Sequence, residues 1–240
     1  MIVQNLQKIE QRIQSACKKS NRKREEVRLL LATKTVNSER IKEAFAAGYT
    51  LIAENKIQEL KEKYDDLKNF PHTNHFIGHL QTNKVKEILR YDVSCIESVD
   101  RLKLAQKLQN RLAYEDKTMD VLIQINTSFE ESKFGISPEN ALGLVREVSG
   151  MDRIRIKGLM TIGLFSAETE KVRKCFRRLK EIQNQIIEEN IPNVEMKELS
   201  MGMSGDLEVA IEEGSTIVRV GTAVFGKRLY PDSYYWNEGN

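Results

Sequence analysis

Short apolar runs alternate with amphipathic segments along most of the chain. Runs rich in Val, Ile and Leu are typical of buried strands, and apolar side chains three and four residues apart are typical of helices that pack one face on a sheet. We predict strands at residues 27–33, 50–53, 75–77, 93–96, 121–125, 154–160, 196–199 and 216–220. We predict helices at residues 2–20, 38–48 (capped by Ser38), 56–68, 82–89, 100–113, 137–149, 168–190 and 206–213.

This alternation predicts an α/β fold with a parallel sheet. Eight strand–helix units of about 25 residues each fit a single closed (β/α)8 barrel of the TIM type, with an extra N-terminal helix at residues 1–20. An open, doubly wound sheet is the alternative. The charges of Arg153, Arg155 and Lys157 are unusual for a strand that is covered on both faces.

We expect one domain, residues 1–240, because no Gly/Ser-rich linker divides the chain. Within it, residues 27–226 would form the barrel and residues 227–240 a C-terminal tail. The tail carries aromatic side chains that would bury well, so we expect it to dock on the barrel. These are Tyr230, Tyr234, Tyr235 and Trp236.

Composition and charge exclude several classes of protein. Lys plus Arg is 38 and Asp plus Glu is 35, so the net charge of +3 gives no support for nucleic-acid binding. No apolar run approaches the ~20 residues that span a bilayer, and the first 24 residues do not resemble a signal peptide. Cys17, Cys95 and Cys175 are odd in number and far apart, which favours a reducing compartment. We therefore expect a cytoplasmic protein without membrane or nucleic-acid partners.

In a parallel barrel the active site lies at the carboxyl ends of the strands, so the residues after each apolar run matter most. Lys34 directly follows such a run. At an apolar barrel mouth its pKa should fall from ~10.4, and a neutral amine can form a Schiff base with an aldehyde. The alternative is a lysine that extends into solvent. Lys157, within a strand, is a weaker candidate.

Two loops near the end of the chain are suited to a phosphate. Residues 200–206 join a strand to a helix, with Ser204 at the expected N-cap, and residues 218–222 end in Gly221-Thr222. Bare backbone N–H groups and a helix N-terminus can bind an anion there, although ordinary turns and caps have the same composition. Arg219, in an otherwise apolar strand, either pairs with a carboxylate or faces a ligand.

The three histidines lie within eight residues of one another, at His72, His75 and His79. No cysteine or nearby pair of acids completes a tetrahedral metal site. We therefore expect core or ligand-adjacent histidines and no metal. No Ser-His-Asp triad or paired carboxylates stand out, and we assign no catalytic residue.

Several of these segments together resemble the pyridoxal phosphate homeostasis proteins, a single-domain barrel family similar to the N-terminal half of alanine racemase. The resemblance runs in family order from about residue 29 to residue 226. It is carried by Thr33-Lys34-Thr35, Glu54-Asn55, residues 75–84, residues 122–126, Gly158-Leu159-Met160, residues 199–204, and residues 218–222 with Phe225-Gly226.

The resemblance implies that Lys34 carries pyridoxal 5′-phosphate (PLP) as a Schiff base. It also implies that Ser204, Gly221 and Thr222 hold the phosphate and that Arg219 faces the pyridine nitrogen. The positions that would line the cofactor are Asn55, Met160 and Ser200. A permanent cation facing that nitrogen would keep it unprotonated and weaken the ring as an electron sink.

The implied function is intracellular PLP homeostasis without robust catalysis: the protein would bind, buffer or deliver the cofactor. PLP-dependent apoenzymes are the candidate recipients, and we expect a monomer or weak dimer. Racemisation needs proton transfer on opposite faces of the substrate, which one lysine alone would do poorly. The alternatives are a weak PLP-dependent racemase, another Schiff-base enzyme such as an aldolase, or a scaffold without cofactor.

Overall fold

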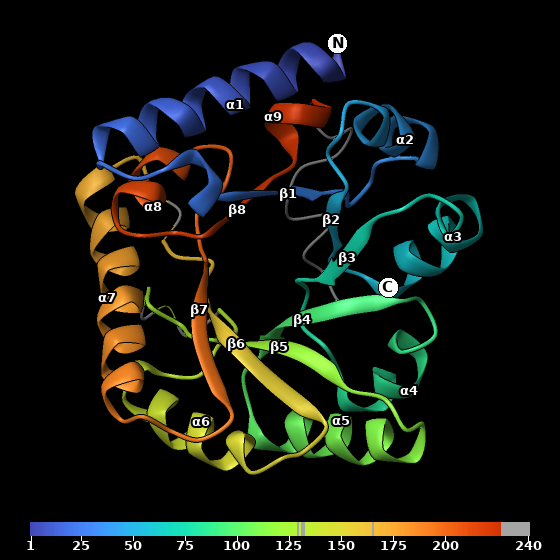
Figure 1. Cartoon of the computed structure of the whole chain (residues 1–240), viewed down its shortest axis with the longest axis vertical. Helices are drawn as coiled ribbons and strands as arrows, with labels where there is room; N and C mark the ends of the chain where they lie inside the picture. Colours follow the sequence, from blue (N-terminus) through green and yellow to red (C-terminus); the bar gives the residue numbers. More distant parts are fainter. Residues whose placement is uncertain (129, 131–132, 165, 227–240) are drawn as a thin grey trace.

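In the computed structural model, which describes residues 1–128, 130, 133–164 and 166–226, eight parallel strands form a closed barrel (Figure 1). Each strand pairs with the next one in the chain, and the last pairs in parallel with the first. The predicted (β/α)8 barrel is therefore confirmed, and the open-sheet alternative is wrong. The strands are β1 (Arg28–Ala32), β2 (Leu51–Glu54), β3 (Thr73–Phe76), β4 (Val93–Val99), β5 (Met119–Gln124), β6 (Ile154–Met160), β7 (Val194–Ser200) and β8 (Ile217–Val220).

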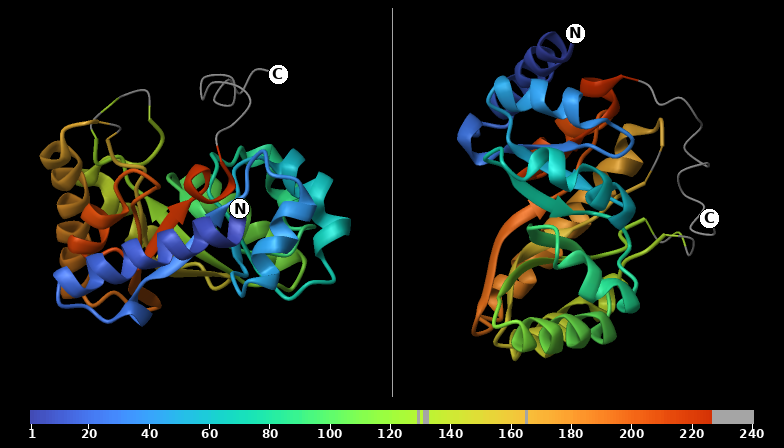
Figure 2. Two further views of the ribbon diagram at one scale, coloured as in Figure 1. Left: turned by 90° about the horizontal axis from the view of Figure 1, so that it is seen from above. Right: turned by 90° about the vertical axis from the view of Figure 1, so that its right-hand side faces the viewer.

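The helices surround the barrel (Figures 1 and 2). Their buried apolar side chains join the same clusters as side chains of the strands, as the amphipathic pattern of the sequence predicts. The helices are α1 (Ile2–Lys19), α2 (Ser38–Ala46), α3 (Ile57–Leu67), α4 (Val85–Ile88), α5 (Leu102–Tyr114), α6 (Ala141–Ser149), α7 (Thr169–Glu188), α8 (Leu207–Glu212) and α9 (Thr222–Phe225). Short 3₁₀ turns occur at η1 (Arg24–Glu26), η2 (Thr82–Lys84) and η3 (Pro138–Asn140).

Helix α1 is an addition to the barrel and lies across α8 and α9 (Figure 1). Its buried side chains recur every three or four residues, as at Leu6, Ile9 and Ile13, and they join the same apolar cluster as side chains of β1 and β8. Arg12 adds a two-pronged ion pair with Glu208 of α8, with Nε–Oε1 and Nη2–Oε2 distances of 2.6 and 2.8 Å. The N-terminal helix is thus part of the folded unit.

The apolar core lies mainly between the barrel wall and the helices. On the side formed by β4 to β7, fully buried side chains of α5, α6 and α7 pack on outward-facing strand residues such as Val121 and Ile123. Inside the barrel, the apolar clusters are small. One contains Leu30, Ala53 and Ile217, and the other contains Cys95, Leu122 and Met160. The rest of the barrel interior is available to polar side chains.

The charges of β6 are explained by its position in the barrel. Its first half lies at the amino-terminal end, where Arg155 pairs with Asp120 of β5 and Lys157 pairs with Glu195 of β7, each at 2.6 Å. Lys157 and Glu195 also line a cavity of about 230 Å³ at this end. Lys157 is therefore far from the carboxyl ends of the strands, where Lys34 lies.

Some boundaries differ from the prediction. Asn37, not Ser38, caps α2, because its side chain accepts a hydrogen bond from the Arg40 N–H at 3.1 Å. Strand β4 continues to Val99 through an irregularity in its pairing with β5. The short helix α9 is an element that the sequence pattern does not indicate. The aromatic residues expected to dock, Tyr230, Tyr234, Tyr235 and Trp236, lie outside the described residues.

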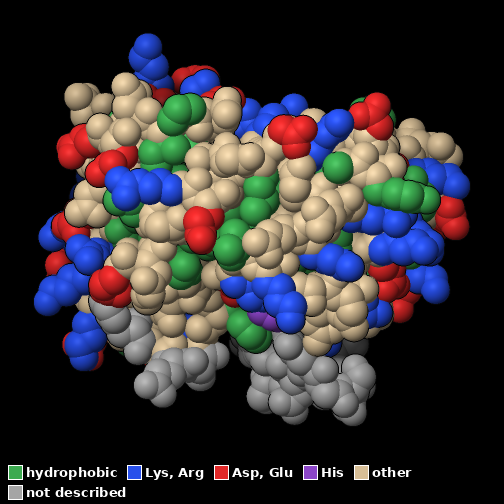
Figure 3. All heavy atoms as spheres, turned by 90° about the horizontal axis from the view of Figure 1, so that it is seen from below, with side chains coloured by type: hydrophobic (Ala, Val, Ile, Leu, Met, Phe, Trp, Pro, Cys, Tyr) green, Lys and Arg blue, Asp and Glu red, His purple; other side chains and the backbone are tan. Residues whose placement is uncertain are grey.

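Three further observations concern the whole molecule. Cys17, Cys95 and Cys175 are buried free thiols. Within the described ranges, no helix is long and apolar enough to cross a membrane. On the face shown in Figure 3, basic and acidic side chains are interspersed, in keeping with the small net charge.

We predict that Ile13→Ala lowers the free energy of unfolding by about 2–4 kcal/mol, because the Ile13 side chain is fully buried where α1 meets the rest of the fold. Urea denaturation measures this change. Ser15→Ala, on the exposed face of the same helix, serves as the control and should change stability by less than about 0.5 kcal/mol. Equal stability of the two variants would show that α1 does not contribute to the core.

Candidate functional site

A cavity of about 440 Å³ opens at the carboxyl ends of the strands. Four residues predicted from the sequence line it: Lys34 after β1, Asn55 after β2, Met160 at the end of β6, and Arg219 in β8. They come from strands far apart in the sequence, and closure of the barrel brings them together. The cavity therefore combines an amine, an amide, a thioether and a guanidinium.

Close packing of the backbone shapes one wall of this cavity. A Cβ atom on Gly78 would lie 1.9 Å from the Asn55 carbonyl oxygen, so only glycine allows the loop after β3 to approach Asn55. The Asn55 Oδ1 atom is buried and has no hydrogen-bond partner among the described residues. A ligand in the cavity could supply that partner.

Arg219 is held inside the barrel by a buried polar network. Its Nη1 donates to Ser200 Oγ at 2.8 Å and its Nη2 donates to the Thr161 carbonyl oxygen at 2.8 Å. Ser200 Oγ in turn donates to Glu97 Oε2 at 2.5 Å. His75 Nδ1 lies 2.6 Å from Glu97 Oε1. The network links β3, β4, β7 and β8 across the barrel and fixes the direction of the guanidinium.

The charges of this network stabilise one another. Burial alone would raise the pKa of Glu97, but His75, Arg219 and Ser200 outweigh it, and the pKa of Glu97 is lowered. Glu97 is therefore a carboxylate, and His75 Nδ1 carries the proton that it donates. Burial lowers the pKa of Arg219, against the effect of Glu97 and Asp206. An arginine nevertheless stays protonated at physiological pH, so the cavity contains a permanent cation.

Ser200, which was also predicted to line the cofactor, lies deeper in the barrel than the four residues that line the cavity. It is fully buried behind Arg219 and bridges the guanidinium to Glu97. It does not line the cavity itself. Glu97 was not predicted as a site residue from the sequence. The only indication of its role is that it is an acidic residue in a strand that is otherwise mostly apolar.

Ser204, Gly221 and Thr222 form a second group of predicted residues. Ser204 Oγ lies 3.5 Å from Thr222 Oγ1 and accepts from the Ala223 N–H at 3.4 Å. A Cβ atom on Gly221 would lie 2.9 Å from the Ala32 carbonyl oxygen, so glycine is needed for β8 to pass β1 closely. Two hydroxyls and a backbone N–H thus lie together at Ser204 Oγ, but none of these residues is among those that line the cavity of about 440 Å³.

Ser204 is not the N-cap that we predicted. Asp206 precedes α8, and its carboxylate accepts a hydrogen bond from the Met203 N–H at 2.5 Å. Because the Asp206 carboxylate accepts the hydrogen bond of this turn, the Ser204 hydroxyl is not needed for it and contacts α9 instead. Arg12 Nη1 donates to the Ser204 carbonyl oxygen at 3.0 Å, so α1 holds this turn from outside the barrel.

The three histidines make separate contacts. His72 Nδ1 lies 2.7 Å from the Phe70 carbonyl oxygen, His75 contacts Glu97, and the His79 ring stacks on Phe134 with centroids 3.9 Å apart. His79 and Phe134 both line the cavity. Across the residues whose placement is described, no group of three or more His, Cys, Asp or Glu side chains is arranged to hold a metal.

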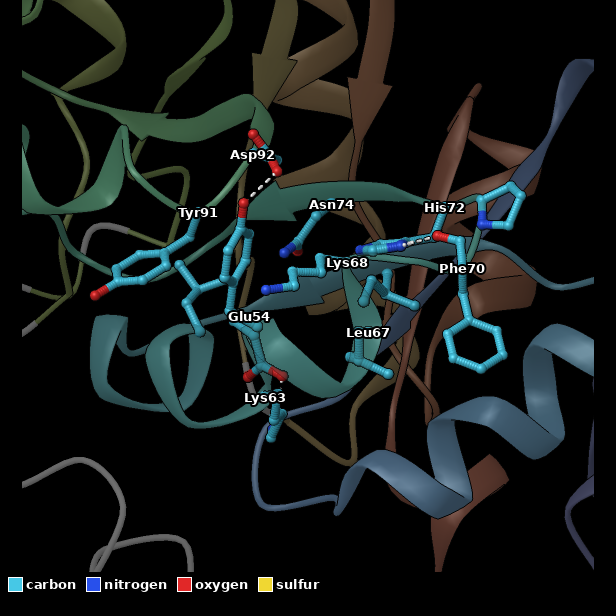
Figure 4. A pocket seen from close by; sticks show the side chains of 13 residues that line it. Glu54, Lys63, Leu67, Lys68, Phe70, His72, Asn74, Tyr91 and Asp92 are labelled. Atoms are coloured by element: carbon cyan, nitrogen blue, oxygen red, sulfur yellow. Dashed lines mark hydrogen bonds and ion pairs between the residues drawn. The ribbon is translucent and has the colours of Figure 1, made fainter.

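Glu54, at the end of β2, accepts a hydrogen bond from the hydroxyl of Thr33, the residue before Lys34. Its side chain is 2% exposed, and its Oε1 lies 2.7 Å from Lys63 Nζ of α3. Burial raises the pKa of Glu54 from 4.5 to about 7, although Lys63 opposes this shift. Figure 4 shows Glu54 and Lys63 at one end of a second cavity, of about 290 Å³, between α3 and strands β2 and β3.

The sequence matches known proteins over most of its length. The family described as the N-terminal domain of alanine racemase matches residues 4–229. A pyridoxal phosphate homeostasis protein from Aquifex aeolicus (strain VF5) is 43% identical over 227 residues, which cover 95% of this chain and 98% of that protein.

Solved structures show the same fold. A protein from Bifidobacterium adolescentis, described as unknown, has a TM-score of 0.88 and 37% identity, with 93% of this chain and 94% of that chain covered. PipY from Synechococcus elongatus PCC7942, solved with PLP bound, has a TM-score of 0.81 and 27% identity, with 94% and 100% covered.

We predict that Glu54 makes stability depend on pH. Because its pKa is raised on folding, its neutral form stabilises the native state below pH 4.5, and this contribution is lost as the pH rises through about 7. The free energy of unfolding of wild type relative to Glu54→Gln should therefore fall by up to about 3 kcal/mol between these pH values. Urea denaturation at several pH values measures this difference, and a constant difference would contradict the assignment.

Proposed function

Because the chain belongs to the pyridoxal phosphate homeostasis protein family, we propose that it binds PLP in the cavity at the carboxyl ends of the strands, as a Schiff base on Lys34. In this proposal the protein binds, buffers or delivers the cofactor and has no robust catalytic activity. The single observation that carries the proposal is that Lys34 and Arg219 line one cavity.

The side chains of the site fit the chemistry of PLP. The lysine amine suits an aldehyde, the convergent Ser204 and Thr222 hydroxyls suit a phosphate, and the buried Oδ1 of Asn55 has no partner in the described part of the chain. Bound PLP would supply an aldehyde that forms a C=N bond with a primary amine, with the release of one water molecule.

Each residue then has a definite role. Lys34 Nζ provides the amine, while Ser204, Gly221 and Thr222 bind the phosphate. Asn55 and Met160 line the cavity, and Ser200 holds Arg219 in place through its 2.8 Å hydrogen bond. Arg219, as a permanent cation, faces the pyridine nitrogen and keeps that nitrogen unprotonated.

The cavity offers limited means for proton transfer. Besides Lys34, the titratable side chains that line it in the described ranges are Lys56, His79, Lys84 and Arg219, and none of these is a carboxylate or a tyrosine. A racemase needs two well-placed bases, and His79 is the residue of this lining that most commonly acts as one, so the racemase alternative depends on the pair Lys34 and His79. Sustained conversion of L-alanine to D-alanine that is lost in Lys34→Ala would favour the racemase alternative.

We further propose that this function is cytoplasmic, that PLP-dependent apoenzymes receive the cofactor, and that the protein is a monomer or weak dimer. The three buried free thiols support a reducing compartment. Transfer of PLP from the loaded protein to an apoenzyme, measured by recovery of the apoenzyme's activity, tests the delivery role.

We predict that PLP followed by borohydride labels Lys34. Peptide mapping of the reduced protein locates the label, and Lys34→Ala should lose it. Lys157→Ala is the matched control and should keep it, because Lys157 lies at the opposite end of the barrel beside Glu195. A label spread over surface lysines in wild type would contradict the proposed site.

We predict that Ser204→Ala and Thr222→Val each weaken PLP binding by about tenfold or more, since each removes a hydrogen bond to a charged group. Binding of pyridoxal, which lacks the phosphate, should change little. Titration of the absorption spectrum measures both affinities, with the exposed Thr118→Val as a control. Equal losses for PLP and pyridoxal would place the phosphate elsewhere.

A further inference from the structure

The backbone that carries Lys34 forms a tight turn in a strained conformation. The Val36 N–H donates to the Thr33 carbonyl oxygen at 2.9 Å, which closes a turn over Lys34 and Thr35. Thr35 has a φ of 65°, in the left-handed region that favours glycine or asparagine. A β-branched residue remains in this conformation only when its surroundings hold it there.

Two side chains of α3 that do not line the cavity hold this turn. The Thr35 N–H donates to Glu59 Oε2 at 2.5 Å, and Lys63 Nζ donates to the Thr33 carbonyl oxygen at 2.9 Å. The residues on both sides of Lys34 are thus bonded to charged groups one helical turn apart. Such charge-assisted hydrogen bonds are stronger than those between neutral groups.

The same cluster joins the turn to β2. Lys63 Nζ also lies 2.7 Å from both Glu54 Oε1 and Glu59 Oε2, so its three donors meet three acceptors. The Thr33 hydroxyl donates to Glu54 Oε1 at 2.6 Å. Lys63 and Glu54 are buried, and this arrangement leaves the turn little freedom to move.

We propose that Glu59 and Lys63 are positioning residues that fix the backbone on both sides of Lys34 and so direct its amine into the cavity. Neither side chain lines that cavity, so both act through the turn. The inference rests on the proposed function, because it assigns to Lys34 the reaction with an aldehyde.

The test compares Glu59→Ala with Glu59→Gln, which keeps a side-chain carbonyl oxygen as acceptor. Glu62→Ala, at an exposed position of the same helix, is the matched control. Two quantities are measured: the rate of borohydride-trapped labelling of Lys34 by PLP over a series of pH values, and hydrogen exchange of the Thr35 amide without ligand. Far-ultraviolet circular dichroism checks folding.

We expect Glu59→Ala to slow labelling by about tenfold or more and to accelerate Thr35 exchange, because a displaced reacting group loses its orientation. Glu59→Gln and Glu62→Ala should stay within about threefold of wild type. If Glu59→Ala does not fold, the double variant Glu54→Gln/Lys63→Met takes its place, since it leaves no unpaired buried Glu54 carboxylate.

Two results would overturn the inference. One would contradict only the positioning role of Glu59 and Lys63, and the other would contradict the proposed function as well. Labelling of Lys34 at the wild-type rate and pH dependence in Glu59→Ala would show that the cluster only stabilises the fold. Wild type that is not labelled at Lys34 would overturn the proposed function and, with it, this inference.

Discussion

A guanidinium inside a closed β-barrel must be compensated, and the arrangement of the site follows from this requirement. Arg219 points inward from β8 and is only 5% exposed, so water can solvate little of its charge. Ser200, the Thr161 carbonyl oxygen and the Glu97 carboxylate together provide the acceptors and the opposite charge. Because these groups belong to different strands, the cation keeps its place only while the barrel is closed.

At the mouth of the barrel, too, residues of the candidate site are held in place by side chains from other elements. Lys34 lies on a turn that Glu59 and Lys63 bond from α3, while Ser204 lies on a turn that Arg12 bonds from α1. The turns that carry Lys34 and Ser204 are thus both held by side chains of helices outside the barrel. If PLP binds as proposed, the N-terminal helix would contribute to the site by holding the turn that carries Ser204.

The sequence predicted the barrel because a closed parallel sheet needs apolar runs that alternate with amphipathic helices, and this chain keeps that alternation throughout. Lys34 and Arg219 could be singled out because each charge interrupts or ends an apolar run. The partners of Arg219 could not be found in this way, since Ser200 and Glu97 are 103 residues apart and only closure of the barrel brings them together. The cap of α8 was misplaced because Ser204 and Asp206 are both good caps, and local sequence does not decide between them.

The central claim is that Lys34, Arg219 and the hydroxyls of Ser204 and Thr222 form one PLP site. A crystal structure of the chain grown with PLP tests it most directly. We predict continuous electron density from Lys34 Nζ to the cofactor, with the phosphate between Ser204 and Thr222 and the ring nitrogen beside Arg219. PLP bound to another lysine, or in the opposite orientation with its phosphate at Arg219, would contradict this account.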